Sequence, residues 1–296
     1  MDNNKRAMMD RRDFLKLAGV GLVGASSARL LLQPSSQVSA SAAGEDDVAT
    51  LYDASKCIGC RACERACKEW NNLPVEPVPP SNLSAIKWNL IKQRQGVDEA
   101  DWPFFNYQCM HCSEASCVAV CPTGAAHHEG EFVIIDPNWC IGCGYCVEAC
   151  PFDVPHLGHG AEKGSARKCW FCFDRVSDGQ MPACAEACPT GALEFGDRDA
   201  LIAKAHDRMA ILKEKGFTDA NLYGENLLGG LHHMSLLVDK PAVYGLPEAP
   251  HVATRGVLGN WLSGVVTAGV VTAVPFWLVF RRKQELAARE VSEGGE

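Results

Sequence analysis

A long apolar run lies near the C-terminal end of the chain, where no charged residue occurs between Arg255 and Arg281. Its core, residues 258–280, reads LGNWLSGVVTAGVVTAVPFWLVF and is 23 residues long. About 20 apolar residues cross a bilayer core as a helix, and Trp261 and Trp277 would lie near the two interfaces. A buried helix of a soluble protein is the alternative, but such helices seldom run this far without a charge. The pattern predicts one transmembrane helix over 255–282, in contact with lipid through 258–280 and followed by a tail, 283–296.

A shorter and less apolar stretch, residues 17–28, lies near the N-terminus and is rich in glycine and alanine. Lys5, Arg6, Arg11 and Arg12 precede it, and the segment DRRDFLK at 10–16 resembles the twin-arginine export motif. The segment 40–42, Ala-Ser-Ala, fits a small-residue cleavage site. Residues 1–43 are therefore predicted to be a twin-arginine signal segment, with a short amphipathic helix as the alternative. This route exports folded proteins, which suits a chain whose cofactors are inserted before export.

The two ends predict the same membrane topology from different residues. Arg281, Arg282 and Lys283 follow the apolar run directly, and basic residues flank membrane helices on the cytoplasmic side. The C-terminus is then cytoplasmic, and the part of the chain before the span is periplasmic. The sequence predicts a single-pass protein of the bacterial inner (cytoplasmic) membrane.

Between the ends, the pattern changes over short distances and predicts an α+β protein. Strands are expected at 132–135, ending at the Asp136-Pro137 turn, and at 193–196, with a further strand-like run near 234–238. A surface helix is expected over 199–215, with Asp197 or Asp199 as its N-cap and Gly216 after it. The apolar positions of this helix are Leu201, Ile202, Ala205, Met209 and Leu212. Residues 197–254 as a whole are expected to form a helix and loop-rich extension.

The charge and the cysteine content change the picture most. The net charge is −8, with no long basic run, which argues against nucleic acid as a partner because phosphate binding needs clustered Lys and Arg. All 16 cysteines lie between Cys57 and Cys188. We expect a cysteine domain over 44–196, with an acidic linker at 44–50 and an insertion without cysteine at 71–104.

The cysteines fall into two kinds of motif, each present twice. CIGCRACERAC at 57–67 and CIGCGYCVEAC at 140–150 are identical at seven of eleven positions and follow the Cys-x2-Cys-x2-Cys-x3-Cys spacing of bacterial ferredoxins. Residues 109–121 and 169–188 are looser, and each ends in Cys-x3-Cys-Pro-Thr-Gly-Ala. A duplicated two-cluster unit explains both repeats.

Iron–sulfur clusters explain this spacing better than disulfides or zinc. Cysteines two residues apart form a tight loop around one cluster, and the following x3 spacing, about one helical turn, directs the fourth thiolate elsewhere. Neighbouring cysteines in such a loop are poorly placed for separate disulfides. Structural zinc would use pairs of Cys-x2-Cys knuckles separated by longer loops. At four thiolates per cluster, the cysteines predict four 4Fe–4S clusters.

No motif indicates a catalytic centre. The sequence contains no nucleophile elbow, P-loop or dinucleotide fingerprint, and the predicted span has no histidine with which to ligate a haem. His111 is expected to tune a cluster or pack, and His232 and His233 to lie at the surface or pack. The aromatic residues adjoining cysteines, which we expect to shield clusters from water, are Trp139, Trp170 and Phe171.

The sequence therefore indicates a non-catalytic electron-transfer subunit with no substrate site of its own. A non-redox metal-binding interaction protein and a self-contained reductase are the alternatives from other classes.

The motif set and its order resemble the iron–sulfur (beta) subunit of membrane-bound, periplasm-facing formate dehydrogenases. The resemblance runs from about Leu51 to Arg282. The segments that carry it are CIGCRACERACKEWNN, NLSAIKW, CMHC, CIGCGYCVEACPFDVP, DRVSDGQMPAC and CPTGALEFG, and in the tail Leu228-Gly229-Gly230 and Tyr244-Gly245-Leu246-Pro247 before one span. The insertion and tail are the discriminating parts, because the cysteine motifs alone match many electron-transfer subunits.

The resemblance implies two tandem ferredoxin-like units, formed by 57–67 with 169–188 and by 109–121 with 140–150. The ligand sets it implies are Cys57, Cys60, Cys63 and Cys188 for cluster 1; Cys67, Cys169, Cys172 and Cys184 for cluster 2; Cys109, Cys112, Cys117 and Cys150 for cluster 3; and Cys121, Cys140, Cys143 and Cys146 for cluster 4. It also implies a catalytic subunit with a molybdenum or tungsten pterin, where formate is oxidised, and a membrane cytochrome b that reduces quinone.

One feature departs from this family. A twin-arginine signal on the iron–sulfur subunit itself is more similar to the iron–sulfur subunit of periplasmic uptake nickel–iron hydrogenases. Hydrogen is therefore the alternative electron source, with nickel–iron hydrogenase subunits as partners, while the insertion and the tail favour formate.

Overall fold

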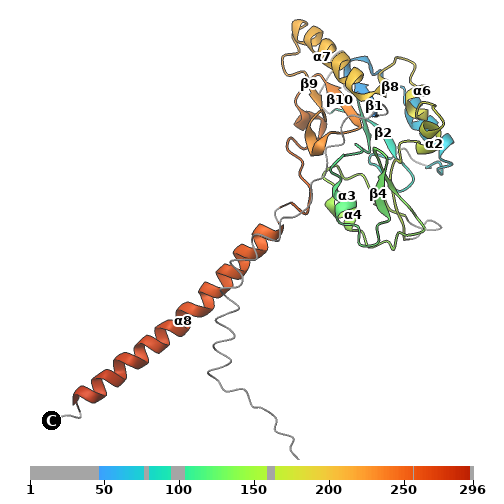
Figure 1. Ribbon diagram of the computed structural model, residues 1–296. Helices are drawn as coiled ribbons and strands as arrows, with labels where there is room; N and C mark the ends of the chain where they lie inside the picture. The colour runs from blue at the N-terminus through green and yellow to red at the C-terminus, as the bar shows by residue number, and fades with distance from the viewer. Residues whose placement is uncertain (1–46, 77–79, 95–103, 159–163, 256, 294–296) are drawn as a thin grey trace, which may run out of the picture. The chain divides into compact units, whose positions relative to one another are not determined.

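The computed structural model describes residues 47–76, 80–94, 104–158, 164–255 and 257–293 (Figure 1). The predicted signal segment, 1–43, lies outside these ranges. The strands are β1 (Val48–Asp53), β2 (Asn89–Gln93), β3 (Phe104–Gln108), β4 (Ala126–Glu129), β5 (Phe132–Ile135), β6 (His156–Leu157), β7 (Ala166–Arg167), β8 (Leu193–Asp197), β9 (Asn221–Tyr223) and β10 (His233–Leu237). The helices are η2 (Ala54–Lys56), α2 (Ala62–Trp70), α3 (Ser116–Ala119), α4 (Tyr145–Ala149), α5 (Phe173–Ser177), α6 (Ala183–Glu186), α7 (Arg198–Glu214), η5 (Leu227–Gly229), η6 (Pro241–Tyr244) and α8 (Val257–Glu293).

The largest sheet joins the two ends of the cysteine region to the segment that follows it. Its strand order is β8-β1-β10-β9, with β1 parallel to β10 and the other pairs antiparallel. Thr50 lies opposite His233 in one pair and opposite Phe195 in the other. The predicted extension 197–254 therefore contributes β9 and β10 to the same sheet as β1 and β8.

Alternation along the strands of this sheet divides its side chains between two hydrophobic clusters. Leu51 and Leu236 pack with Leu201 and Leu212 of α7, so this helix covers one face of the sheet (Figure 1). Tyr52, on the opposite side of β1, belongs to the other, larger cluster, which contains several cysteines. This division follows from the period of two in a strand, and it places the cysteines on the face away from α7.

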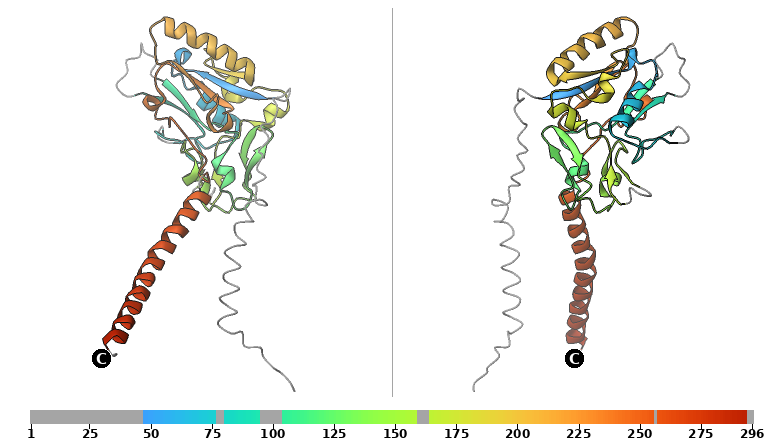
Figure 2. Two further views of the ribbon diagram at one scale, coloured as in Figure 1. Left: turned by 60° about the vertical axis from the view of Figure 1, so that its left-hand side comes forward. Right: turned by 90° about the vertical axis from the view of Figure 1, so that its right-hand side faces the viewer.

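Short hairpins and helices form the remainder of the cysteine region. The antiparallel pairs are β2 with β3, β4 with β5, and β6 with β7. Helix α2 packs against α6, and α3 packs against α4, and Figure 2 shows these elements from two further directions. Each helix pair joins one compact cysteine motif to one Cys-Pro-Thr-Gly-Ala motif, which repeats one arrangement twice.

The C-terminal helix α8 contains one segment, Trp261–Gln284, that is long and apolar enough to cross a membrane by length and composition. Its large apolar side chains, including Trp261, Phe276 and Trp277, are exposed. A buried core helix would cover these side chains, so the exposure favours a lipid environment. The helix continues to Glu293, beyond the end of the predicted span at 282, because no glycine or proline follows Pro275 until residue 294.

The structure bears out most elements predicted from the pattern. The strands at 132–135 and 193–196 correspond to β5 and β8, and the strand-like run near 234–238 corresponds to β10. Asp197 caps α7 by accepting a hydrogen bond from the backbone N of Ala200 at 2.7 Å, so the first of the two proposed caps is used. The predicted linker 44–50 is wrong at its end, because β1 begins at Val48. Ala49 and Leu51, both buried, had been missed as the start of a strand.

Candidate iron–sulfur centres

The structure brings the sixteen cysteines together in four sets. Three sets line separate cavities. We call them group 1 (Cys57, Cys60, Cys63 and Cys188), group 2 (Cys67, Cys169, Cys172 and Cys184) and group 3 (Cys109, Cys112, Cys117 and Cys150). Group 4 comprises Cys121, Cys140, Cys143 and Cys146, in which Cys146 interacts electrostatically with the other three. These sets have the same members as the four ligand sets implied by the sequence resemblance.

Group 1 is formed where the chain turns from β1 into α2. Gly59 has a φ of +67°, and a Cβ atom there would lie 2.5 Å from the ring of Phe104. Gly142, the equivalent glycine of the second compact motif, has a φ of +70° and would place a Cβ 1.9 Å from a backbone oxygen of residue 164. Only glycine fits both the backbone conformation and the space, which explains why each motif begins Cys-Ile-Gly-Cys.

Helix α2 divides its two cysteines between two cavities. Cys63 and Cys67 are both buried and lie about one helical turn apart. Cys63 lines the cavity of group 1, whereas Cys67 lines that of group 2 with Cys169 and Cys184. The x3 spacing thus gives the arrangement expected of a fourth cysteine that serves a neighbouring cluster.

The hydrogen bonds to sulfur repeat between the two halves of the chain. The backbone N of Ala126 donates to Cys121 Sγ at 3.3 Å, and that of Leu193, five residues after Cys188, donates to Cys188 Sγ at 3.4 Å. Thr123 and Thr190 lie beside the same two sulfurs at 3.7 and 3.8 Å. Hydrogen bonds to ligand sulfurs are one of the determinants of cluster potential. The Cys-Pro-Thr-Gly-Ala motif therefore forms one hydrogen-bonded turn, used twice.

Group 3 has a buried lysine in the wall of its cavity. Lys168 is 4% exposed. Its ammonium donates to the carbonyl oxygens of Val133 and, at 2.9 Å, of Cys169. Burial lowers its pKa, but the thiol positions of Cys109, Cys117 and Cys169 outweigh burial, and the pKa is raised overall. The side chain is therefore a buried cation whose neighbours belong to groups 2 and 3.

The four groups are arranged in a series. The pairs of cysteines that interact electrostatically across neighbouring groups are Cys63 with Cys184, Cys169 with Cys109, and Cys117 with Cys146. These pairs join group 1 to group 2, group 2 to group 3, and group 3 to group 4. Cys60 of group 1 and Cys143 of group 4 are the exposed cysteines. The series therefore reaches the protein surface at each end.

Without a bound cation, the most buried cysteines of these groups would be neutral thiols. Burial raises the pKa of Cys67 and of Cys117 to about 12 and, with the neighbouring thiols, raises the pKa of Cys146 to about 11. Four such sulfurs cannot all be ionised without a positive partner. Iron supplies that charge, and metal binding releases the thiol protons. The donor sets of groups 1 to 3 therefore fit iron–sulfur clusters by number, chemistry and enclosure, and that of group 4 fits by number and chemistry.

The aromatic residues and histidines near the cysteines behave in different ways. Phe171 is 4% exposed and shields the cavity of group 2, as expected. Trp139 is 62% exposed, so the prediction that it shields a cluster from water is wrong within this chain. The ring of His111 is buried and packs edge-on against Phe171 at 4.9 Å. His232 and His233 are buried as well, so neither lies at the surface.

Three polar side chains near the sulfurs had not been predicted. They are Lys168, described above; Asn106, whose Nδ2 lies 3.7 Å from Cys63 Sγ; and Asn71, whose Nδ2 lies 3.7 Å from Cys67 Sγ. For Lys168 a weak signal exists, since a lysine directly before a Cys-x2-Cys pair is placed next to a cluster. Asn106 lies on β3, 43 residues from Cys63 in sequence, and only the tertiary fold brings it there.

Comparison with known proteins agrees with this geometry. Two models of the 4Fe-4S dicluster domain match the chain, at residues 56–125 and 100–198. The iron–sulfur subunit of formate dehydrogenase-O from Escherichia coli is 40% identical over 224 residues, covering 71% of this chain and 74% of the relative. This protein belongs to the family of formate dehydrogenase iron–sulfur subunits. The nitrate-inducible formate dehydrogenase subunit of the same organism is 38% identical over 222 residues, covering 70% and 75% of the two sequences.

Subunits of other oxidoreductases share part of the same family framework. The electron transfer subunit of thiosulfate reductase from Salmonella typhi is 43% identical over 152 residues, which is 50% of this chain and 75% of the relative. The formate dehydrogenase subunits match over more of this chain. This protein is therefore an electron-transfer iron–sulfur subunit of the formate dehydrogenase type, and its cysteines hold 4Fe–4S clusters in dicluster domains.

Proposed function

We propose that this protein carries electrons through four 4Fe–4S clusters, one in each cysteine group, from a catalytic formate dehydrogenase subunit to a membrane cytochrome b that reduces quinone. The observation that carries the proposal is the serial arrangement of four four-cysteine groups with an exposed cysteine at each end. A storage or structural role would not need a continuous series. A path that begins and ends at the surface fits transfer between two partners.

The proposal assigns two tandem ferredoxin-like units to the cysteine region. Groups 1 and 2 belong to the unit formed by 57–67 with 169–188, and groups 3 and 4 to the unit formed by 109–121 with 140–150. The packing of α2 on α6 and of α3 on α4 supports this division. Each unit then contributes half of the path, with groups 2 and 3 at the junction.

Each bound cluster would accept and release one electron at a time. The protein holds the irons through thiolates fixed on short helices and left-handed turns, so little rearrangement accompanies the change of charge. Buried apolar side chains such as Ile91, Phe152 and Phe171 exclude water from the cavities. Backbone N–H groups donate to sulfur and stabilise the added negative charge. This role requires neither a proton donor nor a substrate pocket.

Exposed apolar side chains lie at both ends of the series. In group 1, Ile58 is 62% exposed beside Cys60, and in group 4, Ile141 is 67% exposed beside Cys143. Trp139 and Tyr145 add exposed aromatic surface near group 4. Such patches are characteristic of contact sites. We propose that one end meets the catalytic molybdenum or tungsten pterin subunit and the other meets the cytochrome b.

The same proposal places the cluster domain on the periplasmic side of the bacterial inner membrane, anchored by α8. The apolar segment Trp261–Gln284 and the basic residues 281–283 support this orientation. An N-terminal twin-arginine segment over 1–43 would deliver the folded, cluster-loaded chain there. Protease added to intact spheroplasts should digest the cluster domain and spare a C-terminal epitope tag.

The decisive experiment is purification of the native complex through a tag on this chain. We expect about 16 iron atoms per chain, reduction of all clusters by formate, and a pterin-containing large subunit. A colourless protein without iron would contradict electron transfer altogether. Reduction by hydrogen but not by formate, with nickel in place of pterin, would assign the same role to an uptake hydrogenase, the alternative suggested by the signal segment.

Continuity of the path can be tested by a substitution inside group 2. Cys184 is 7% exposed and lines the cavity of group 2, the second position in the series. In Cys184→Ser, we expect formate to reduce only the clusters on the donor side of the break, and quinone reduction to be lost. Ser177→Ala, at an exposed position of α5, should leave both unchanged. Unimpaired quinone reduction in a Cys184→Ser complex that lacks cluster 2 would refute the serial path.

A further inference from the structure

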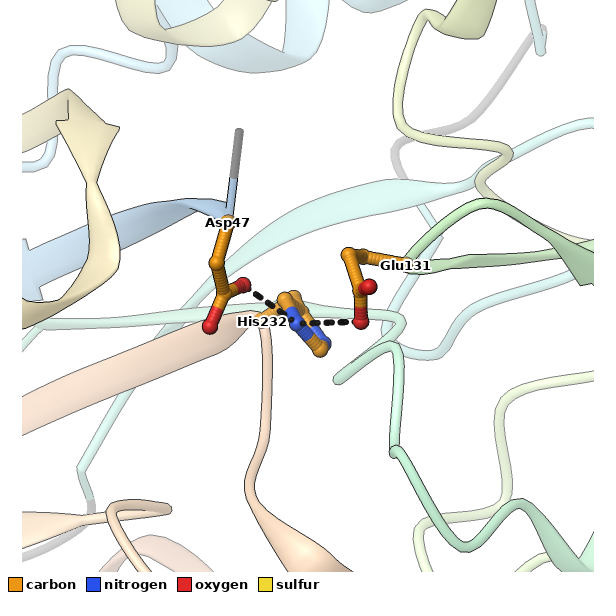
Figure 3. A group of neighbouring side chains, drawn as sticks. All are labelled: Asp47, Glu131 and His232. Atoms are coloured by element: carbon orange, nitrogen blue, oxygen red, sulfur yellow. Dashed lines mark hydrogen bonds and ion pairs between the residues drawn. The ribbon is translucent and has the colours of Figure 1, made fainter. Parts of the chain in front are cut away.

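Three segments that are far apart in sequence meet around the side chain of His232. Asp47 directly precedes β1, Glu131 lies in the turn between β4 and β5, and His232 directly precedes β10. Their ligand atoms lie within 4.8 Å of one another (Figure 3). None of the three belongs to a cysteine group, and the electron-transfer role makes no use of them.

The hydrogen bond on the far side of the imidazole determines which nitrogen carries a proton. His232 Nδ1 lies 3.0 Å from the carbonyl oxygen of His111. A carbonyl oxygen only accepts hydrogen bonds, so Nδ1 must be the donor. In the neutral ring, Nε2 is then an unprotonated acceptor. A backbone carbonyl that orients the second nitrogen in this way is the usual partner of a metal-ligating histidine.

On its other side, the imidazole faces two carboxylates. Nε2 lies 3.0 Å from Asp47 Oδ1 and 3.6 Å from Glu131 Oε2. A cation between the three acceptor atoms would neutralise the two carboxylates and accept the lone pair of Nε2. A proton on Nε2 forms a hydrogen bond with one carboxylate only, because 3.6 Å is beyond hydrogen-bond distance. The carboxylate of Glu131, 40% exposed, would then be left to water alone.

A divalent metal ion meets both requirements. Zinc binds imidazole nitrogen and carboxylate oxygen at about 2.0–2.2 Å, so tetrahedral ligand atoms lie about 3.4 Å apart. The separations of Nε2 from the two carboxylate oxygens, 3.0 and 3.6 Å, bracket that value, and those two oxygens lie within 4.8 Å of each other. Two carboxylates and a neutral imidazole balance the charge of the ion. The side chain of His232 is 2% exposed, whereas those of Asp47 and Glu131 are 24% and 40% exposed, which leaves one side open for entry of the ion and for a water ligand.

We propose that Asp47, Glu131 and His232 bind one divalent transition-metal ion of the zinc class. Imidazole with carboxylates suits zinc among the ions of this class. The ion would join the start of β1, the β4–β5 turn and the entry to β10, and so hold the hairpin beside group 3 against the main sheet. It is a site separate from the iron–sulfur centres.

The test is metal analysis of the full-length protein, purified with its clusters from cells supplied with zinc. We expect about one zinc per protein molecule in addition to the iron. Asp47→Asn and Glu131→Gln alter partly exposed side chains, so the fold should survive, and each should weaken zinc binding at least tenfold in a chelator competition. His206→Asn is the matched control, because His206 Nε2 also pairs with a carboxylate, at 3.1 Å, but with only one.

Zinc X-ray absorption distinguishes this site from zinc that has replaced iron at cysteines. The proposed site gives only nitrogen and oxygen scatterers near 2.0–2.1 Å, whereas a cysteine site gives sulfur near 2.3 Å. Zinc bound by sulfur, or equal zinc in the wild-type and the Asp47→Asn proteins, would overturn the proposal. An iron-replete protein without zinc would overturn it as well. Absence of iron would refute the electron-transfer role without affecting this outcome.

Discussion

Replacing Lys168 by methionine removes the buried positive charge between groups 2 and 3 and keeps a side chain of similar length. The ammonium donates to the carbonyl oxygen of Cys169, in group 2, and lines the cavity of group 3. Reduction adds one negative charge to a cluster, which a nearby cation stabilises. The prediction is therefore that Lys168→Met lowers the reduction potentials of clusters 2 and 3.

The magnitude follows from the contact geometry. Two unit charges about 4 Å apart interact by about 4 kcal/mol at an effective dielectric constant of 20. An added electron is delocalised over a cluster at about twice that separation, which gives about 2 kcal/mol. Since about 1.4 kcal/mol corresponds to about 59 mV for one electron, the expected decrease is about 85 mV.

Redox titration followed by electron paramagnetic resonance measures this decrease cluster by cluster. Lys204→Met is the control, because Lys204 is 56% exposed and pairs with Glu194 at the surface; its potentials should match those of the wild-type protein. Iron content must be equal in all three proteins. Potentials of clusters 2 and 3 that stay within about 20 mV of the wild-type values would refute the electrostatic argument. A change of about 20 mV alters the equilibrium constant for one-electron reduction by less than half of a power of ten.

The remaining predictions concern stability and the membrane. Lys87→Met leaves the carboxylate of Glu64 buried without its ion-pair partner, and we expect a loss of about 3–5 kcal/mol in unfolding free energy; thermal unfolding should show a much smaller loss when Glu64→Gln is added. Asp197→Ala removes the cap of α7. The lost cap costs about 1 kcal/mol, so hydrogen exchange of the amides in the first turn should become about fivefold faster, whereas Asp199→Ala should leave the exchange rates unchanged. Burial lowers the pKa of His233 to about 3, so as the pH falls this histidine is protonated in the unfolded state before it is protonated in the folded state. Its contribution to folding stability is therefore complete above pH 6.5 and falls as the pH drops towards 3, with a loss of about 2 kcal/mol at pH 5. In denaturant titrations, His233→Gln should remove this pH-dependent loss. Val270→Arg places a charge near the middle of the apolar segment, which costs about 2.5–3.5 kcal/mol of membrane-insertion free energy. Cell fractionation should therefore show less of the protein in the membrane. An unchanged amount in the membrane would contradict the assignment of α8 as a membrane span.

The cysteine groups were predictable because covalent spacing and a repeat encode them. The x2 spacings bring thiolates together locally, and the resemblance supplied the partners across the sequence. Asn106 was not predictable in the same way, since it reaches Cys63 through a contact set by the tertiary fold, and the position of Lys168 directly before Cys169 was only a weak signal. The triad of Asp47, Glu131 and His232 has no local signal either, because its members are separated by more than 80 residues at each step.

The strand β1 was missed for a physical reason. Residues 45–47 are all acidic, which suggests a solvated linker, but a largely apolar run begins at Val48 and continues to Tyr52. Pairing with β8 and β10 is what makes this segment a strand. The helix α7, in contrast, was predictable almost to the residue, because its cap and its terminal glycine are local signals.

The parallel pairing of β1 with β10 also dictates an order of assembly. Cys57 and Cys188 share a cavity although 131 residues separate them, while the members of group 3 all lie within 109–150. During synthesis, the cysteines of groups 3 and 4 emerge from the ribosome close together, but group 1 stays incomplete until residue 188 has emerged. The main sheet stays incomplete until β10 follows at 233–237. Iron loading of groups 1 and 2 must therefore wait until residue 188 has been made, so a truncated form ending near residue 160 would keep groups 3 and 4 complete, would lack Cys169, Cys172, Cys184 and Cys188, and would break the path at its midpoint.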